Sequence, residues 1–281
     1  MPDPLRLHFT DLLSEARQGR LRTMVGRETE LGQLLRTLGR RVKNNLLIAG
    51  PPGVGKTALI EGTAAVLSRE ILPTLRTVPM IRLDTAQFAS VLRQTPALSL
   101  LGRIRRALAS LPPAVVVIDE FGALLNERLA DPWDLEEIFA PFFRRRDLRL
   151  LGTLTDEEHR TSIQGHSRIE KYVEVLHLAE PPSDVCVQIL TRAAPLLQAR
   201  YRLTVSQDVL RRAVELARQL PSGRAMPDRA LQLADEACAL CAVHGKASMS
   251  EEDLHTVVSE RSGMPTRSAA RQDRRRLRQL P

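Results

Sequence analysis

Over the first 180 residues, short apolar runs alternate with stretches in which apolar residues recur at helical spacing. A short apolar run between turn residues predicts a buried strand, and leucines three or four apart, as from Leu31 to Leu38, predict a helix. Strands are expected at residues 46–49, 80–84, 114–118, 148–155 and 173–179, and helices at 28–41, 56–68, 86–110 and 133–145. This alternation predicts an α/β fold, a parallel five-stranded sheet with helices on both faces.

The pattern changes at Glu180–Pro181–Pro182, after which it is mostly helical. Expected helices run from Ser183 to about Leu197, begin after Ser206, cover Pro227–Val243, and begin at Ser250, where Ser250-x-x-Asp253 fits a capping box. These helices predict a small C-terminal helical domain. The expected organisation is a helical lead-in and linker at 1–24, a large α/β domain at 25–181, the helical domain at 182–262 and a basic tail at 263–281.

The segment Gly50–Thr57 reads GPPGVGKT and fits the phosphate-binding loop pattern. It follows an apolar run and opens a helical stretch, which is the context that the motif needs, because glycines let backbone N–H groups surround phosphate oxygens at a helix N-terminus. Lys56 is expected to reach the β- and γ-phosphates, and the Thr57 hydroxyl to bind Mg²⁺. The expected nucleotide contacts in this loop are Pro52, Gly53, Val54, Gly55, Lys56, Thr57 and Ala58.

A second segment, Ala114–Glu120, reads AVVVIDE and predicts a buried strand that ends in two acids. Asp119 is expected on the Mg²⁺ side, and Glu120 is expected to polarise the attacking water. The alternative is a chance glycine-rich turn followed by an unrelated core strand, which the order and context of the two motifs disfavour. Together they predict an ATPase that uses ATP and Mg²⁺ as cofactors.

Composition narrows the class of protein. Among the 281 residues, 43% are apolar but only 3% are aromatic, so the cores are expected to be aliphatic. No apolar run approaches the roughly 20 residues of a membrane span, and the first residues do not resemble a leader peptide. Three cysteines make no disulfide framework. We therefore expect a cytoplasmic protein without a membrane contact.

The net charge of +8 is concentrated at the end of the chain. Six arginines against Asp273 give the residues from 263 onward a charge of +5. Such a tail is expected to be a solvated, disordered end. Contact between residues 264–281 and nucleic acid or an acidic partner remains the open alternative, although no aromatic residue is present for base stacking.

The order of motifs resembles the first ATPase module of the Clp family of AAA+ protein-remodelling machines, the ClpA/ClpB type. The resemblance covers about residues 9–243. It rests on these pieces: Phe9–Ala64 with its EARQG, VGR and KNN segments, Leu83–Asp84–Thr85, Ile118–Asp119–Glu120, Ala179–Glu180–Pro181 and MPDRALQLADEA at Met226–Ala237. It implies the AAA+ P-loop NTPase fold.

The resemblance also implies roles for residues outside the two motifs. Val25 and Gly26 match the segment that lines the adenine pocket, and Ile189 and Pro227 of the helical domain would close over the base. Thr155 falls where the family has its first sensor residue, whose hydroxyl orients the lytic water. The alternative for Thr155 is a threonine at a strand end that caps the next turn.

Two departures from the family bear on activity. Lys171 and Tyr172 stand where the family has an arginine pair that reaches the neighbouring subunit's ATP. Lysine lacks the planar fork of guanidinium, so slow hydrolysis is expected with Lys171 as the candidate, unless Arg168 replaces it. The stretch Ser90–Pro96, at the family's substrate-gripping loop, has no aromatic residue, which argues against threading of polypeptide. The chain also has no room for the family's N-terminal domain, coiled-coil insertion or second ATPase module.

Two weaker patterns favour structural roles. Cys238-x-x-Cys241, with His244 nearby, has metal-like spacing, but four ligands are usual for zinc, so buried helix cysteines are expected. Arg144–Arg146 is expected to be a solvated helix end.

The sequence therefore predicts an ATP-binding, slowly hydrolysing AAA+ ATPase of Clp type that acts on protein partners. Self-association through the ATP face, as a hexameric ring or an open arc, is expected. The alternative is an ATP-switched regulatory or scaffold protein, associated with DNA through the tail.

Overall fold

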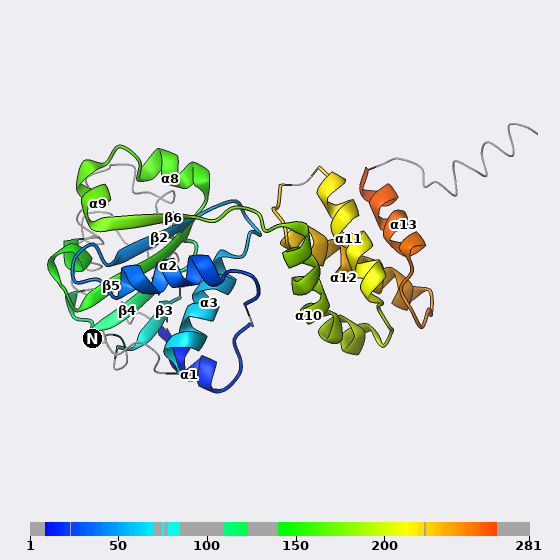
Figure 1. The fold of residues 1–281 in the computed structure, drawn as a ribbon, viewed down its shortest axis with the longest axis horizontal. Coiled ribbons are helices and arrows are strands. Elements are labelled where there is room, and N and C mark those ends of the chain that lie inside the picture. The colour runs from blue at the N-terminus through cyan, green and yellow to red at the C-terminus, as the bar shows by residue number, and fades with distance from the viewer. Residues whose placement is uncertain are drawn as a thin grey trace, which may run out of the picture. The chain divides into compact units, whose positions relative to one another are not determined.

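The computed structural model describes residues 9–22, 24–69, 75, 78–84, 109–122, 140–221 and 223–262. The chain divides into two compact units. One consists of Met1–Pro51 and Gly55–Ala179, and the other of Pro52–Val54 and Glu180–Pro281. Figure 1 shows the first as a sheet with helices and the second as a group of helices.

The first unit is built on a six-stranded sheet. Its spatial order is β1 (Phe9–Asp11), β3 (Met80–Leu83), β4 (Ala114–Ile118), β5 (Leu148–Leu154), β2 (Asn45–Ala49) and β6 (Val173–His177). The five strands from β3 to β6 are parallel, as predicted, and β1 is antiparallel to β3. The prediction of a helical lead-in missed β1, because three residues are too few to show a period of two.

Side chains alternate between two buried faces of this sheet, so both faces are covered. In β4, Ala114, Val116 and Ile118 share a core with Phe121 and Phe142, whereas Val115 and Val117 are equally buried but lie outside that core. The helix α2 (Glu28–Leu38) packs against β2 and β6, and also against α3 (Lys56–Leu67). Full burial of β2 and β4 explains why both read as continuous apolar runs.

The remaining helices of this unit are short: α1 (Leu12–Arg17), α8 (Asp156–Ser162) and α9 (Ser167–Tyr172). Of the expected helix 86–110, all but the last two residues lie outside the described residues. Of the expected helix 133–145, residues 140–144 are described and are helical. The strand expected at 148–155 ends one residue earlier, because Thr155 already caps α8.

The second unit contains α10 (Ser183–Tyr201), α11 (Gln207–Gln219), α12 (Asp228–Val243) and α13 (Glu251–Ser262). α10 and α11 start where the sequence predicted, α12 and α13 start one residue later than predicted, and α10 extends beyond Leu197. Ser206 caps α11 through a bond from the Val209 amide. The core is aliphatic, as expected from the scarcity of aromatic residues, and it includes all three cysteines.

Burial also decides the cysteine pattern. Cys238 and Cys241 are fully buried, and burial raises the pKa of their thiols to about 11 and about 12, respectively. Within the described part of the chain, no group of three or more histidine, cysteine or acidic side chains is placed to hold a metal ion. Nor is any helix there both long enough and apolar enough to cross a membrane.

Candidate functional site

The loop between β2 and α3 has the backbone conformation that glycine permits. Gly53 and Gly55 have φ of +85° and +103°, in the left-handed region, and Gly55 is the N-cap of α3. The Gly50 amide donates to the Leu154 carbonyl oxygen at 3.2 Å, so the loop begins against the end of β5. Val54 is buried, and Pro52–Val54 is grouped with the second unit.

Lys56 lies at the start of α3, and its ammonium group is held by the loop itself. Its Nζ donates to the carbonyl oxygens of Gly50 at 2.6 Å and Pro51 at 3.1 Å. Burial lowers the pKa of Lys56, and the negative charges of nearby carboxylates oppose that shift. These carboxylates belong to Asp156, Glu158, Asp119 and Glu120. The predicted phosphate-binding cation therefore lies within electrostatic range of the predicted acid pair.

Asp119 joins the two motifs. Its Oδ2 accepts from the Thr57 hydroxyl at 2.9 Å, and its Oδ1 accepts from the Thr153 hydroxyl at 2.7 Å. Thr57 and Asp119, the two predicted Mg²⁺ ligands, are thus in direct contact across 62 residues of chain. A hydroxyl and a carboxylate are the oxygen donors that Mg²⁺ prefers, so these residues fit the predicted metal.

Glu120 follows in a conformation that is rare for a residue with a side chain. Its φ is +54°, and its side chain is exposed. A non-glycine residue in this region costs about 1–3 kcal/mol unless its surroundings hold it there. The Glu120 amide donates to the Thr153 hydroxyl at 2.8 Å, which supports that conformation.

Thr155 adopts the capping geometry that the sequence left open as its alternative role. Its hydroxyl accepts from the Glu158 amide at 3.1 Å, and its amide donates to the Glu158 carboxylate at 2.7 Å. This reciprocal pair is a capping box at the N-terminus of α8. Glu158 also lies so close to Gly122 that a Cβ there would overlap its carboxylate. The sensor role of Thr155 stays a prediction.

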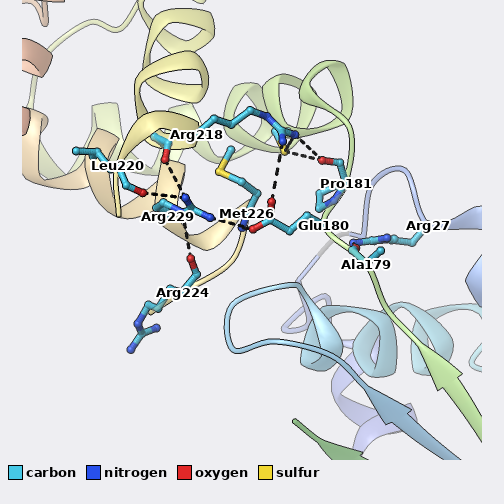
Figure 2. A network of polar contacts seen from close by, with 11 residues as sticks. Arg27, Ala179, Glu180, Pro181, Arg218, Leu220, Arg224, Met226 and Arg229 are labelled. Atoms are coloured by element: carbon cyan, nitrogen blue, oxygen red, sulfur yellow. Dashed lines mark hydrogen bonds and ion pairs between the residues drawn. The ribbon is translucent and has the colours of Figure 1, made fainter. Parts of the chain in front are cut away.

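The predicted adenine segment lies in the first unit. Gly26 has φ of +68°, and its amide donates to Glu28 Oε1 at 3.3 Å. The next residue, Arg27, donates from Nη2 to the Ala179 carbonyl oxygen at 2.7 Å (Figure 2), which orders this segment beside partly buried Val25. Ile189 in α10 is partly buried and Pro227 is buried, and both belong to the second unit, so a shared adenine pocket stays a prediction.

Lys171 lies in the last turn of α9 and is exposed. Its Nζ is 5.8 Å from the centroid of the Tyr172 ring, and that ring stacks on Phe143 at 4.7 Å. Within the described ranges, no acidic side chain forms an ion pair with Lys171. Arg168, the alternative cation, lies one turn earlier in the same helix.

A network of arginines surrounds Glu180 at the start of the second unit (Figure 2). Glu180 Oε1 accepts from the Met226 amide and from Arg229 Nη2, both at 2.9 Å. Arg229 also donates to the carbonyl oxygens of Arg224, Ala217 and Leu220. Arg218 donates to the Pro181 carbonyl oxygen at 2.7 Å. The Glu180–Pro181 segment is therefore fixed by side chains from α11 and α12.

The sequence interpretation missed Thr153, although it contacts both acids of the site. Thr153 is 1% exposed in β5, opposite Ile48 of β2. Ile118 of β4 pairs with Gly152 of β5. The residues that follow these two, Asp119 and Thr153, therefore point to the same face of the sheet. The signal in the sequence was that Thr153 is the one uncharged polar side chain in the run LRLLGTL, whereas the family's sensor position falls on Thr155.

Two family profiles match this chain. The profile described as "ATPase family associated with various cellular activities (AAA)" matches residues 46–160, which include both motifs of the site. The profile described as "AAA lid domain" matches residues 183–280. The chain carries a Clp-type AAA+ module. Both its nucleotide-binding fold and its C-terminal helical region thus fit one architecture.

Curated relatives place the module within this branch. It is 31% identical over 261 residues to the chaperone protein ClpB of Yersinia enterocolitica, and 31% identical over 239 residues to heat shock protein 100 of Trypanosoma brucei brucei. These alignments cover 91% and 84% of the chain but only 29% and 28% of the relatives. The module therefore spans less than a third of the curated proteins that it resembles.

Solved structures agree. A closed-state reconstruction titled as Hsp104 with ATPyS and FITC casein matches with a TM-score of 0.80 and 26% identity, over 93% of this chain and 47% of that one. The Saccharomyces cerevisiae Hsp104–ADP complex also matches at 0.80, with 28% identity over 92% of this chain and 45% of that one.

Proposed function

We propose that this Clp-type module binds ATP with Mg²⁺, hydrolyses it slowly, and uses the cycle to act on protein partners. The observation that carries the proposal is the contact between Thr57 and Asp119, with Lys56 facing the same carboxylate cluster. A phosphate loop joined to a strand-end acid pair in this way is the arrangement that phosphoryl transfer requires.

The geometry supports a division of labour among these residues. Lys56 exchanges its present carbonyl partners, Gly50 and Pro51, for phosphate oxygens, which are stronger acceptors because they are charged. The Thr57 hydroxyl and the Asp119 carboxylate would hold Mg²⁺, which would supply positive charge to neutralise the phosphates. Glu120 is exposed at the strand end, where its carboxylate can accept a proton from the attacking water.

Slow hydrolysis follows from the side chain at position 171. An arginine finger contributes about 10³–10⁵ in rate, and a lysine ammonium cannot reproduce its two parallel hydrogen bonds. The exposure of Lys171 supports its availability to a neighbouring copy. We propose self-association through this face, as a hexameric ring or an open arc.

Protein partners are proposed from the relatives. Those named above are chaperone and heat shock proteins, and one matched structure is titled as containing casein. The absence of an aromatic residue in Ser90–Pro96, which lies outside the described residues, leads us to propose action without threading.

Calorimetry with Lys56→Ala tests the proposal. The variant should bind ATP at least about tenfold more weakly, because it removes a charge-assisted phosphate contact. Lys43→Gln is the matched control, since Lys43 is a half-exposed lysine that only approaches Glu174, at 3.9 Å. Equal ATP affinities for the parent and Lys56→Ala would refute nucleotide binding at this loop.

Turnover should be measured against protein concentration, with molecular mass recorded in parallel. The proposal expects slow hydrolysis in the parent and assembly that depends on ATP. Binding and assembly without turnover would instead support the ATP-switched scaffold. Salt-sensitive DNA binding that disappears on truncation after Ser262 would further indicate the DNA-associated form of that alternative.

A further inference from the structure

We infer that Thr153 is a positioning residue of the ATPase site, whose buried hydroxyl sets the directions of Asp119 and Glu120. The inference rests on the proposed function, since it concerns how the acid pair is aligned for Mg²⁺ and water. It assigns a role to a residue that neither sequence motif contains.

The hydroxyl of Thr153 bonds both to the Asp119 carboxylate and to the Glu120 backbone amide. It donates its single proton to Asp119 Oδ1 at 2.7 Å and accepts the Glu120 N–H at 2.8 Å. One donor and one acceptor function of a hydroxyl are thereby satisfied together. A hydroxyl that served only the packing of β5 would need no more than one partner, and neither partner would have to belong to the acid pair.

The position in the sheet makes this geometry unavailable to the neighbouring residues. Gly152 pairs with Ile118, the last residue of β4, so Thr153 is the first residue of β5 to lie beyond that strand. A Cβ at Gly152 would lie 2.7 Å from the Leu47 side chain, on the other face of the sheet. Thr155 uses its hydroxyl to cap α8. Of Gly152, Thr153 and Thr155, Thr153 alone is therefore both buried and bonded to the acid pair.

Each carboxylate oxygen of Asp119 accepts a hydrogen bond from one threonine hydroxyl, and the two bonds should respond differently to Mg²⁺. Thr57, on Oδ2, is itself an expected Mg²⁺ ligand, so its bond to Asp119 must adjust when the metal binds. Thr153, on Oδ1, lies in the sheet and has no such second role. Its bond can therefore keep the carboxylate plane fixed while the metal enters.

Glu120 depends on the same hydroxyl through its backbone. The positive φ of Glu120 directs an exposed side chain that forms no hydrogen bond or ion pair with the described residues, apart from long-range attraction to Lys56. The Glu120 amide donates to the Thr153 hydroxyl at 2.8 Å and, over a longer distance of 3.2 Å, to Asp119 Oδ1, so Thr153 is the nearer of the two acceptors that hold the peptide in that conformation. Loss of the hydroxyl should therefore misalign the base without removing it.

The test compares Thr153→Val with Thr153→Ser and with a matched control. Valine keeps the size of threonine and removes the hydroxyl, whereas serine keeps the hydroxyl. Thr63→Val is the control, because Thr63 is also fully buried but its hydroxyl donates only to the Leu59 carbonyl oxygen within α3. A general effect of removing a buried hydroxyl would appear in both valine variants.

We expect Thr153→Val to lower kcat and to raise the Mg²⁺ concentration for half-maximal turnover, each by about 10- to 100-fold, as for other residues that orient metal-binding carboxylates. ATP affinity in EDTA should change by less than about threefold, because Lys56 and the loop are untouched. Thr153→Ser should restore both parameters, and Thr63→Val should leave them unchanged.

The outcomes separate this inference from the proposed function. A parent that neither binds nor hydrolyses ATP overturns both. A parent that does both, with Thr153→Val unchanged or with Thr63→Val equally impaired, overturns only the role of Thr153. If Thr153→Val does not fold, hydrogen exchange is compared between the parent and Thr153→Ala. Faster exchange of the Glu120 amide in Thr153→Ala supports the inference, and unchanged protection, which Asp119 Oδ1 would then provide alone, overturns it.

Discussion

Asp119 in the first unit and Asp253 in the second are both aspartates with several hydrogen bonds, but their partners differ. Asp119 accepts from two threonine hydroxyls and from the Glu120 amide, and from no cation in the described structure. Asp253 is 3% exposed and accepts from Lys246 at 2.5 Å as well as from the Ser250 amide and hydroxyl. Asp253 thus has a cation of its own within the fold, whereas Asp119 is held by neutral donors and has no cation among the described residues.

The arginines and lysines repeat this contrast. In the helical unit, the Arg229 guanidinium donates to three carbonyl oxygens and to Glu180. In the α/β unit, Lys56 holds only the carbonyl oxygens of its own loop, and Lys171 is exposed. Lys56 and Asp119 at the phosphate loop thus lack an ionic partner in the described structure, whereas Asp253 and Arg229 of the second unit each have one within the fold.

The largest effect should come from Glu120→Gln, which tests whether the exposed Glu120 carboxylate of the first unit acts in ATP hydrolysis. Glutamine keeps the shape but cannot accept a proton from water, so turnover should fall by at least about 100-fold while ATP still binds. The melting temperature should not change, since the side chain is exposed. Glu157→Gln, an exposed glutamate on α8, is the control. Hydrolysis at the parent rate in Glu120→Gln would show that another group is the base.

Arg229→Ala tests whether the stability of the second unit depends on the hydrogen bonds that Arg229 makes within it. The substitution leaves the carbonyl oxygens of Ala217 and Leu220 without this donor, and Glu180 without its closest cation. Hydrogen bonds to charged groups contribute about 1.5–3 kcal/mol, so the free energy of unfolding should fall by about 2 kcal/mol or more. Urea unfolding measures it, with exposed Arg192→Ala as the control. Equal urea midpoints for Arg229→Ala and Arg192→Ala would show that the hydrogen bonds of Arg229 do not stabilise the second unit.

Asp253 should make the helical unit sensitive to acid. Burial alone raises the pKa of Asp253, but hydrogen bonds from Lys246 and Ser250 outweigh it and lower that pKa to about 2. A folded pKa below the ordinary value stabilises the fold above about pH 4, and this stabilisation is lost as the pH falls toward 2.

The matching variant is Asp253→Asn. A shift of this size is equivalent to about 2 kcal/mol, so the variant should be less stable by that amount at pH 7 and should approach the parent near pH 2. Glu252→Gln, an exposed neighbour on α13, should follow the parent at every pH. A stability difference between parent and Asp253→Asn that does not vary with pH would contradict the assignment.

The smallest effect should come from Lys171→Arg. If Lys171 occupies the position of a finger arginine, the assembled Lys171→Arg variant should turn over ATP several-fold faster than the assembled parent. The gain should stay below the full factor of about 10³, because the residues around α9 do not position a guanidinium. Arg168→Ala should leave the rate nearly unchanged. A collapse of turnover in Arg168→Ala would show that the finger lies one turn earlier.

The elements that the sequence predicted well are those with long, continuous signals. The five parallel strands and the four helices of the second unit carry apolar patterns of adequate length, and the phosphate loop carries a motif with a mechanism. β1 escaped because three residues, Phe9–Asp11, gain their strand conformation only from β3, more than 70 residues away.

Side-chain partnerships were harder to predict, because they depend on register and on contacts distant in sequence. Thr153 is distinguished from Thr155 only by where β4 ends relative to β5. The matching segment Ala179–Glu180–Pro181 was recognised, but its bonds to Arg27, Arg218 and Arg229 join parts of the chain up to 152 residues apart. The site roles of Thr155, Lys171, Ile189 and Pro227 stay predictions.

The order of strands also sets when the site can exist during synthesis. β2, which leads into the phosphate loop, pairs only with β5 and β6 in the described sheet. β5 begins at Leu148, so roughly 100 residues must follow β2 out of the ribosome, about 5–20 s of elongation, before the loop has a neighbouring strand to stand on. A nascent chain that stops before Leu148 therefore carries the complete phosphate-loop motif, yet it lacks the sheet that would present that loop to ATP.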